Sequence, residues 1–169
     1  EFDFGEGIEV ILGGGRAQFI PIYSEYHEYP ERNGTRTDGR NLIDEWAVQG
    51  TERKYVWNLE AFSNLNPKSH SQFLGLFEPS HLKFEVDRSK DSAGEPSLAE
   101  MTAFAINRLS FDPKKDFFLL VEAGRIDHGH HAGNAYRALT DTVAFSDAIK
   151  VAKSLVDINE TLMIVTADH

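Results

Sequence analysis

The chain has 169 residues, 41% hydrophobic and 26% charged, which is the composition of an ordinary globular protein. No apolar run approaches the ~18 residues that a membrane-spanning helix needs, and the formal net charge of -10 argues against a nucleic-acid partner. The absence of cysteine excludes disulfides and thiolate metal sites within this sequence.

Short apolar segments alternate with amphipathic segments along the chain. Strands are predicted at 8–12, 55–57, 72–77, 117–121 and 162–165, and helices at 38–48, 97–109 and 134–156. The helix at 97–109 starts with a capping box, because Ser97 is followed three residues later by Glu100. The alternation predicts an α/β fold with a mainly parallel sheet between two layers of helices.

The remaining segments are predicted to be turns and surface loops. The ranges 21–39 and 86–96 are polar and contain Pro, Gly or Ser. The three glycines at 13–15 lack the GxGxxG spacing and the lysine of a phosphate-binding loop, so we interpret them as a turn that needs positive φ.

Polar side chains follow two of the predicted strands at the point where each strand ends. They are Glu122, Asp127, His128 and His131 after the strand at 117–121, and Asp168 and His169 after the strand at 162–165. The two strands and the helix between them form a predicted βαβ unit, which places both carboxyl ends at one edge of the sheet. Although these side chains are distant in sequence, they are therefore expected to lie close together in space.

Carboxylate and imidazole groups together suit zinc, whereas the oxygen-only Glu122 suits magnesium. Asp127 and His131 are four residues apart, so one helical turn would aim both at one ion. Two ligands are too few to hold one zinc ion, so two zinc ions would need further ligands from outside this segment. Taken singly, the His-Gly-His-His run also fits a polar loop, and Asp168 also fits a helix cap. Arg125 could bind an anion or form a surface salt bridge.

Residues 121–131 (Val-Glu-Ala-Gly-Arg-Ile-Asp-His-Gly-His-His) and 165–169 (Val-Thr-Ala-Asp-His) resemble the alkaline phosphatases, in particular the animal type. The resemblance extends over nearly the whole chain, with further landmarks at 10–16, 34–42, 55–58, 75–79 and 96–98. It implies an alkaline-phosphatase-like fold of which residues 1–169 are an incomplete, central segment of a longer single catalytic domain. Glu1 at the start and a candidate ligand at the end agree with that expectation.

The resemblance implies two zinc ions and one magnesium ion. Asp127 and His131 would be ligands of the first zinc, and Asp168 and His169 of the second. Glu122 would hold the magnesium.

The resemblance also implies a phosphate site and a calcium site. His128 would line the phosphate site. A structural calcium ion would be held by the Phe77 carbonyl, Glu78 and Glu95, although Glu95 stands where the family has Asp and the preceding loop is lengthened. Ala123 replaces a usual Gly.

The implied reaction is the hydrolysis of phosphate monoesters through a phosphoseryl intermediate. The nucleophilic Ser, a phosphate-binding Arg and an Asp ligand are expected upstream, and a His ligand downstream. Asp91-Ser92-Ala93 is similar to the nucleophile motif, but its place in a polar loop makes this a coincidence. The segment alone is therefore expected to be inactive. The alternatives are a non-catalytic metal-binding relative, or a phosphodiesterase or sulfatase of the same superfamily.

The resemblance further implies a homodimer outside the cell, secreted or attached to the plasma membrane by a lipid anchor that lies outside this segment. Phosphate monoesters are the expected partners, and nucleic acid is not. The sequons at Asn33 and Asn159 fit a secreted glycoprotein.

Overall fold

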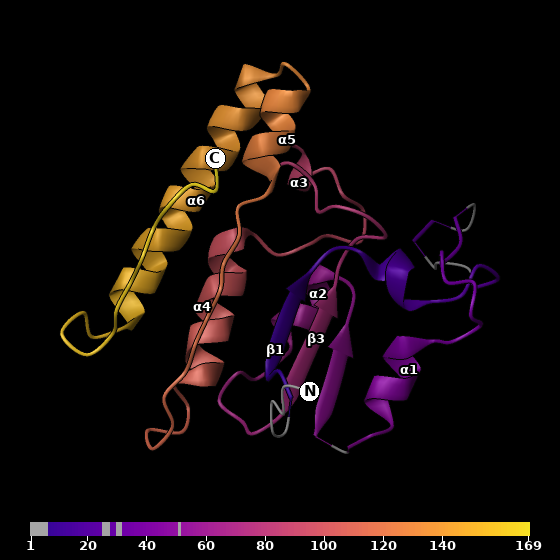
Figure 1. The fold of residues 1–169 in the computed structure, drawn as a ribbon, viewed down its shortest axis with the longest axis horizontal. Coiled ribbons are helices and arrows are strands. Elements are labelled where there is room, and N and C mark those ends of the chain that lie inside the picture. The colour runs from indigo at the N-terminus through magenta and orange to yellow at the C-terminus, as the bar shows by residue number, and fades with distance from the viewer. Residues whose placement is uncertain (1–6, 25–27, 30–31, 51) are drawn as a thin grey trace.

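The computed structural model describes residues 7–24, 28–29, 32–50 and 52–169. At its centre is a three-stranded parallel sheet in the order β1-β3-β2 (Figure 1). The strands are β1 Val10–Gly13, β2 Arg53–Val56 and β3 Gln72–Leu76. Parallel neighbours joined by helices and loops confirm the predicted α/β class.

The described residues also form seven helical elements. They are the 3-10 helix η1 Arg16–Phe19 and the α-helices α1 Leu42–Ala47, α2 Leu59–Ser63, α3 Glu85–Arg88, α4 Leu98–Leu109, α5 Arg125–His131 and α6 Ala135–Leu155, counted over the described residues. α4 begins with the predicted capping box, in which Ser97 Oγ accepts the Glu100 N–H and the Glu100 carboxylate accepts the Ser97 N–H. The predicted turn at the glycines is also present, because Gly15 has φ 78°.

The helix predicted at 38–48 is shorter than expected. Gly39 has φ 74°, which lies outside the helical region, and the Asn41 side chain caps α1 by accepting the N–H groups of Ile43 and Asp44. Asp38 instead accepts hydrogen bonds from Arg36. The cap therefore fixes the start of α1 four residues later than the amphipathic pattern indicated.

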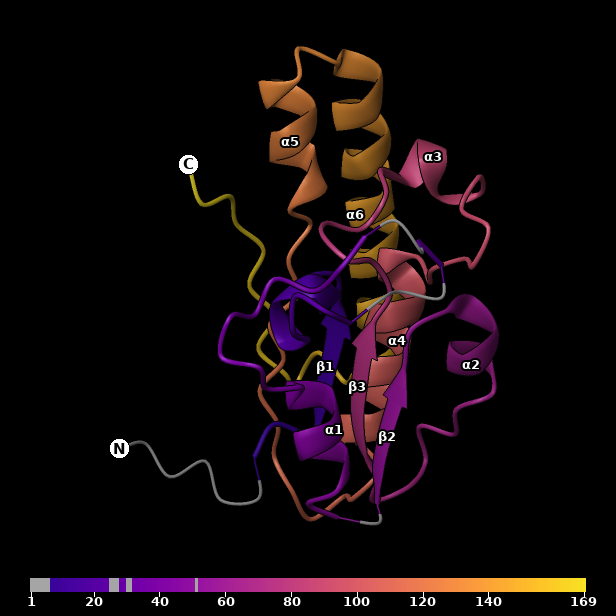
Figure 2. The same cartoon turned by 90° about the vertical axis from the view of Figure 1, so that its right-hand side faces the viewer.

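β3 is the buried central strand, and its alternating side chains divide the core in two. Leu74 and Leu76 pack with Ile43 of α1 on one face. Phe73 packs with Phe62 of α2 and other side chains from α4 on the opposite face. Helices thus cover both faces of the sheet, as the three-layer prediction required (Figure 1, Figure 2).

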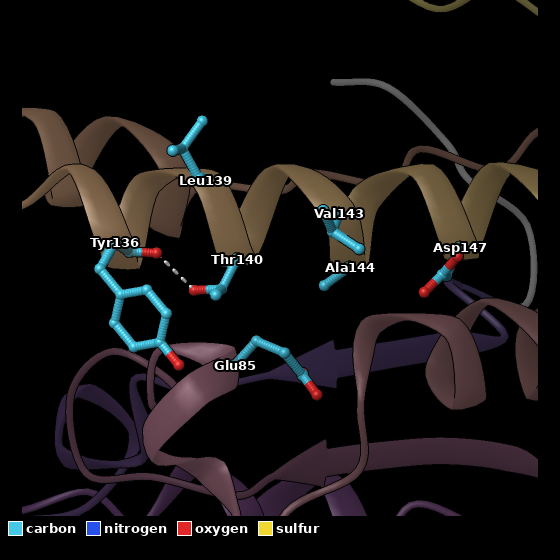
Figure 3. A pocket seen from close by; sticks show the side chains of 7 residues that line it. All are labelled: Glu85, Tyr136, Leu139, Thr140, Val143, Ala144 and Asp147. Carbon is cyan, nitrogen blue, oxygen red and sulfur yellow. Dashed lines mark hydrogen bonds between the residues drawn. The ribbon is translucent and has the colours of Figure 1, made fainter.

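α5 and α6 form a helical hairpin beyond the sheet, and α6 also packs against α4 (Figure 1). Gly133, with φ 60°, makes the turn between α5 and α6. Tyr136 and Leu139 of α6 remain exposed, and they line a pocket of about 460 Å³ opposite Glu85 of α3 (Figure 3). None of the described helices combines the length and apolarity needed to cross a membrane.

The predictions of strands at 117–121 and 162–165 are wrong for this structure. Both segments lie outside the three-stranded sheet, with Phe118 87% and Leu162 85% exposed. Alternating apolar residues indicate an extended conformation, but a strand also needs a neighbour that accepts its backbone hydrogen bonds. No described residue supplies that neighbour to either segment.

Candidate functional site

α5 carries the first pair of predicted metal ligands. Asp127 and His131 are one helical turn apart, and His131 Nε2 lies 3.4 Å from Asp127 Oδ2. The C-cap Ala132 donates its N–H to His128 O and so holds the last turn of α5 in shape. The predicted helical spacing therefore does bring this carboxylate and this imidazole together.

The chain ends beside this pair, although the predicted βαβ pairing is absent. His169 Nε2 lies 3.5 Å from the other carboxylate oxygen of Asp127, and His169 Nδ1 lies 3.0 Å from Asp168 Oδ1. The hydrogen bond with His169 lowers the pKa of the Asp168 carboxyl, and the same bond with Asp168 raises the pKa of the His169 imidazole. All four predicted zinc ligands thus form one chain of polar contacts.

These donors fit zinc by type, because imidazole nitrogens and carboxylate oxygens are common zinc ligands. The two imidazoles lie near different oxygens of the Asp127 carboxylate. These ligands are open to solvent, because the side chains of His131 and His169 are 77% and 73% exposed. No three of these donors lie within 4.8 Å of one another, as far as the described ranges go. The arrangement therefore offers pairs of ligands and leaves the remaining coordination positions to groups outside it.

Of the other predicted residues near α5, His128 makes specific contacts and Glu122 does not. Arg125 lies with its guanidinium NH1 2.8 Å from His128 Nδ1, and the ring of His81 lies 4.4 Å from that of His128. Because arginine can only donate, His128 Nδ1 is the acceptor and the neutral ring carries its proton on Nε2. Glu122 is exposed and has no hydrogen bond or ion pair with any described residue.

A second acidic centre lies at the loops that follow β1 and β3. Carboxylate oxygens of Glu28, Glu78 and Asp91 lie within 4.8 Å of one another, and they are the one such group among the described residues. The Glu28 side chain is 1% exposed, and Glu78 is buried as well. Glu28 Oε1 and Asp91 Oδ2 are buried without a hydrogen-bond partner. Buried carboxylate oxygens gathered in this way fit a hard cation such as Ca²⁺.

Electrostatics in this acidic centre favour added positive charge. Burial, followed by the charges of Glu78 and Asp91, raises the pKa of the Glu28 carboxyl. The same causes raise the pKa of Glu95 to about 7. Lys83 Nζ offsets part of the negative charge, at 2.8 Å from Glu78 Oε1, and Arg16 does so at 2.9 Å from Glu28 Oε2.

The acidic centre only partly overlaps the predicted calcium ligands. Glu78 belongs to it, and the preceding Phe77 is fully buried. Glu95 lies outside the group and accepts the Lys83 backbone N–H at 2.7 Å, with its other oxygen unpartnered. Glu28 and Asp91 were missed by sequence reasoning, because each is a single acid in a polar loop and no local spacing links them to Glu78.

Comparisons with known proteins agree on one family. The family model described as alkaline phosphatase matches residues 4–169. Alkaline phosphatase from Gadus morhua is 45% identical over 96% of this chain, and the tissue-nonspecific isozyme from Gallus gallus is 45% identical over 96%. The membrane-bound alkaline phosphatase from Bombyx mori is 44% identical over 98%. The chain spans 34%, 32% and 30% of the lengths of these three relatives.

Solved structures give the same result. The crystal structure of Thermus thermophilus alkaline phosphatase superposes with a TM-score of 0.72 at 35% identity, over 90% of this chain and 28% of that one. The cold-active enzyme from Shewanella sp. superposes with a TM-score of 0.62 at 24% identity, over 86% of this chain and 29% of that one, and supports the fold alone. Because the family model covers nearly every residue and the α/β architecture agrees, this chain belongs to the alkaline phosphatase family.

Proposed function

We propose that the protein containing this chain hydrolyses phosphate monoesters through a phosphoseryl intermediate, with the nucleophilic serine outside this segment. The observation that carries the proposal is the contact of Asp127 with both His131 and His169, which lie 38 residues apart. Family membership supports the same reaction. The reaction suits such a site because phosphoryl transfer depends mainly on positioning and charge stabilisation.

Two zinc ions are the proposed cofactors at this site. Asp127 and His131 would hold the first, Asp168 and His169 the second, and Glu122 would hold a magnesium ion. When bound, such cations supply Lewis-acid stabilisation of the charge that develops on the attacking and leaving oxygens. The exposure of His131 and His169 agrees with this proposal, because each ion needs further ligands and these side chains leave room for them.

His128 is the proposed contact to the phosphate. Its Nδ1 is engaged by Arg125, so its Nε2–H is the group free to donate to a phosphate oxygen. A donor held by a second side chain loses little conformational freedom on binding. The proposed role of His128 is therefore to bind and orient the substrate.

A calcium ion at the acidic centre is the proposed structural cofactor. Its ligands would be Glu28, Glu78 and Asp91, with the Phe77 carbonyl nearby and Glu95 at its border. The crowding of carboxylates and the unpartnered oxygens of Glu28 and Asp91 support this assignment. Such an ion would tie together loops that are far apart in sequence.

The assembly and the location of the whole protein are also proposals. We propose a homodimeric glycoprotein outside the cell, either secreted or lipid-anchored at the plasma membrane. The membrane-bound relative from Bombyx mori supports attachment to a membrane.

The test is phosphate release by the full-length protein. Hydrolysis of 4-nitrophenyl phosphate should disappear after chelation and return with Zn²⁺ and Mg²⁺. Asp127→Asn should lower kcat/KM at least about a hundredfold, because it removes metal-based stabilisation worth several kcal/mol. Asp147→Asn is the matched control, since Asp147 is exposed and pairs with Lys150.

Two outcomes would reject the proposal. One is phosphate release that persists in the chelated protein or in Asp127→Asn. The other is a protein that binds metal but releases no phosphate, as a non-catalytic relative would. Faster turnover of bis(4-nitrophenyl) phosphate or 4-nitrophenyl sulfate would favour a phosphodiesterase or a sulfatase instead.

A further inference from the structure

A pocket of about 440 Å³ lies between residues 78–87 and the start of α5, and its wall is mostly cationic. Four basic side chains, Arg32, Lys83, Arg125 and Arg137, line it together with only two carboxylates, Glu78 and Asp87. Such an excess of positive charge is unexpected in a chain whose formal net charge is -10. The pocket therefore differs from the rest of the molecule in the sign of its charge.

Both carboxylates of the pocket already have cationic partners. Lys83 Nζ lies 2.8 Å from Glu78 Oε1, and Arg137 NH2 lies 2.8 Å from Asp87 Oδ2. No described carboxylate forms an ion pair with the other two cations, Arg32 and Arg125. Arg32 lies over the Tyr29 ring at 4.9 Å instead. The positive excess of the pocket thus resides on two arginines.

Arg125 is the more constrained of these two arginines. Its guanidinium lies 3.8 Å from the centre of the Phe84 ring, NH1 contacts His128, and Nε is buried without a hydrogen-bond partner in the described structure. Asp141, Glu95 and Asp87 are near enough to offset part of its charge, but among the described residues none of them forms an ion pair with it. Arg125 therefore presents an unused donor and a charge without a directly paired carboxylate at a partly buried position.

A cation that is partly removed from water without a directly paired anion is unfavourable. An oxyanion would supply both the missing charge and the missing acceptor, and arginine binds carboxylate and phosphate with matched geometry. Burial and the nearby His128 and Arg125 lower the pKa of His81, so the positive charge of the pocket comes from its lysine and arginines. The chemistry of the pocket thus selects a carboxylate or phosphate group.

We propose that this pocket is a subsite for a second anionic group on the leaving group of a phosphate monoester, bound by Arg125 and, at the exposed end, by Arg32. The inference rests on the proposed phosphatase function, and it adds a substrate class to it. Arg125 joins the two places, because the same guanidinium lines the pocket and contacts His128, the proposed phosphate ligand. Substrates that carry a carboxylate or phosphate beside the scissile ester are therefore preferred.

The experiment compares two substrates that differ only at the end of the leaving group, where a carboxylate replaces a methyl group. Propyl phosphate and 3-(phosphonooxy)propanoate are hydrolysed by the full-length protein, and the ratio of their kcat/KM values is measured. Arg125→Gln should lower the preference for the carboxylate substrate roughly tenfold, the value of one charge-assisted hydrogen bond. Arg125→Lys should restore part of it. Using the ratio removes any effect on His128, because both substrates share the same phosphate.

Two further variants keep the test interpretable. Arg32→Gln changes an exposed residue of the pocket, so it tests the subsite even if Arg125→Gln misfolds. Arg40→Gln is the matched control, because Arg40 is an exposed arginine outside the pocket that pairs with Glu45. The ratio should fall in Arg32→Gln and stay unchanged in Arg40→Gln.

Each contrary outcome has its own meaning. Equal ratios in the unmodified protein and in the Arg125 and Arg32 variants would overturn the subsite and leave the phosphatase function standing. Failure to hydrolyse either substrate would overturn the phosphatase function, and the subsite with it. Equal ratios, combined with inhibition by free inorganic phosphate that both variants abolish, would assign the pocket to a free anion and reject a substrate subsite.

Discussion

Replacing Gly129 by alanine tests whether the close approach of α5 to α6 positions the proposed zinc ligands. Gly129 is the buried residue of α5, and a Cβ atom there would lie 2.7 Å from Ala138 N and 3.0 Å from Ala138 Cβ. Asn134 N–H also donates to Gly129 O at 2.9 Å, which fixes the two helices at this point. The obstacle is largely backbone, so no side-chain rotation can relieve it.

Two opposing contributions set the change in the free energy of unfolding of Gly129→Ala. Overpacking costs about 1–3 kcal/mol, whereas alanine in place of glycine within a helix gains about 1 kcal/mol. Because the clash is with backbone atoms, we expect the upper part of that range and a net loss of about 2 kcal/mol in the free energy of unfolding. α5 must move away from α6, and Asp127 and His131 move with it. A shift of a few tenths of an ångström should lower kcat roughly tenfold.

The assay is urea unfolding of the full-length protein, together with bound zinc per chain and kcat for 4-nitrophenyl phosphate. Gly13→Ala is the control, because a Cβ at Gly13 has no neighbour within 4 Å. An increase of about 1 kcal/mol in the stability of Gly129→Ala, as helix propensity alone predicts, would refute the reasoning. Unchanged zinc content and kcat would show that this approach does not position the ligands.

Three other predictions follow from single contacts. Calcium at a hundred times its Kd should stabilise the folded protein by about 2.7 kcal/mol and so raise its Tm. Asp91→Asn should weaken calcium binding, measured by calorimetry, and reduce this rise in Tm. Ser97→Ala should lower the free energy of unfolding in urea by about 1 kcal/mol, because it removes the α4 cap. Lys90, and then Arg137, hold the pKa of Asp87 below its ordinary 3.8, so its ionised form adds stability that is lost as pH falls through the folded value. Asp87→Asn should therefore flatten the decline in stability below about pH 4 in acid titrations.

The correct sequence predictions concern patterns that are satisfied locally. Ser97 and Glu100 form their capping box because both partners lie within one helical turn. Asp127 and His131 meet for the same reason, as residues i and i+4 of α5. The core was predictable through β3, since a short apolar run between loops signals a strand buried on both faces.

The missed features depend on partners that sequence spacing does not encode. Residues 117–121 and 162–165 have the composition of strands, but a ladder requires a neighbour from elsewhere in the chain. Glu28 and Asp91 join Glu78 across 50 and 13 residues of sequence, so no period reveals them. The resemblance to the family pointed to Glu95 instead, and the structure places Asp91, which precedes it in the same loop, in the acidic group.

The two candidate centres differ in how much of their surroundings the chain itself supplies. The acidic centre contains three carboxylates from this segment, of which Glu78 is buried and Glu28 and Asp91 are partly buried. The proposed zinc donors His131 and His169 are exposed. The apolar residues Phe118 and Leu162, in the extended segments that precede these donors, are exposed as well. The incomplete metal coordination and the exposed apolar side chains thus occur in neighbouring parts of the chain. The chain spans only 34% of the length of the Gadus morhua relative. We therefore expect further polypeptide to pair with these segments and to complete the proposed zinc sites, whereas calcium binding at the acidic centre should survive in the 169-residue chain.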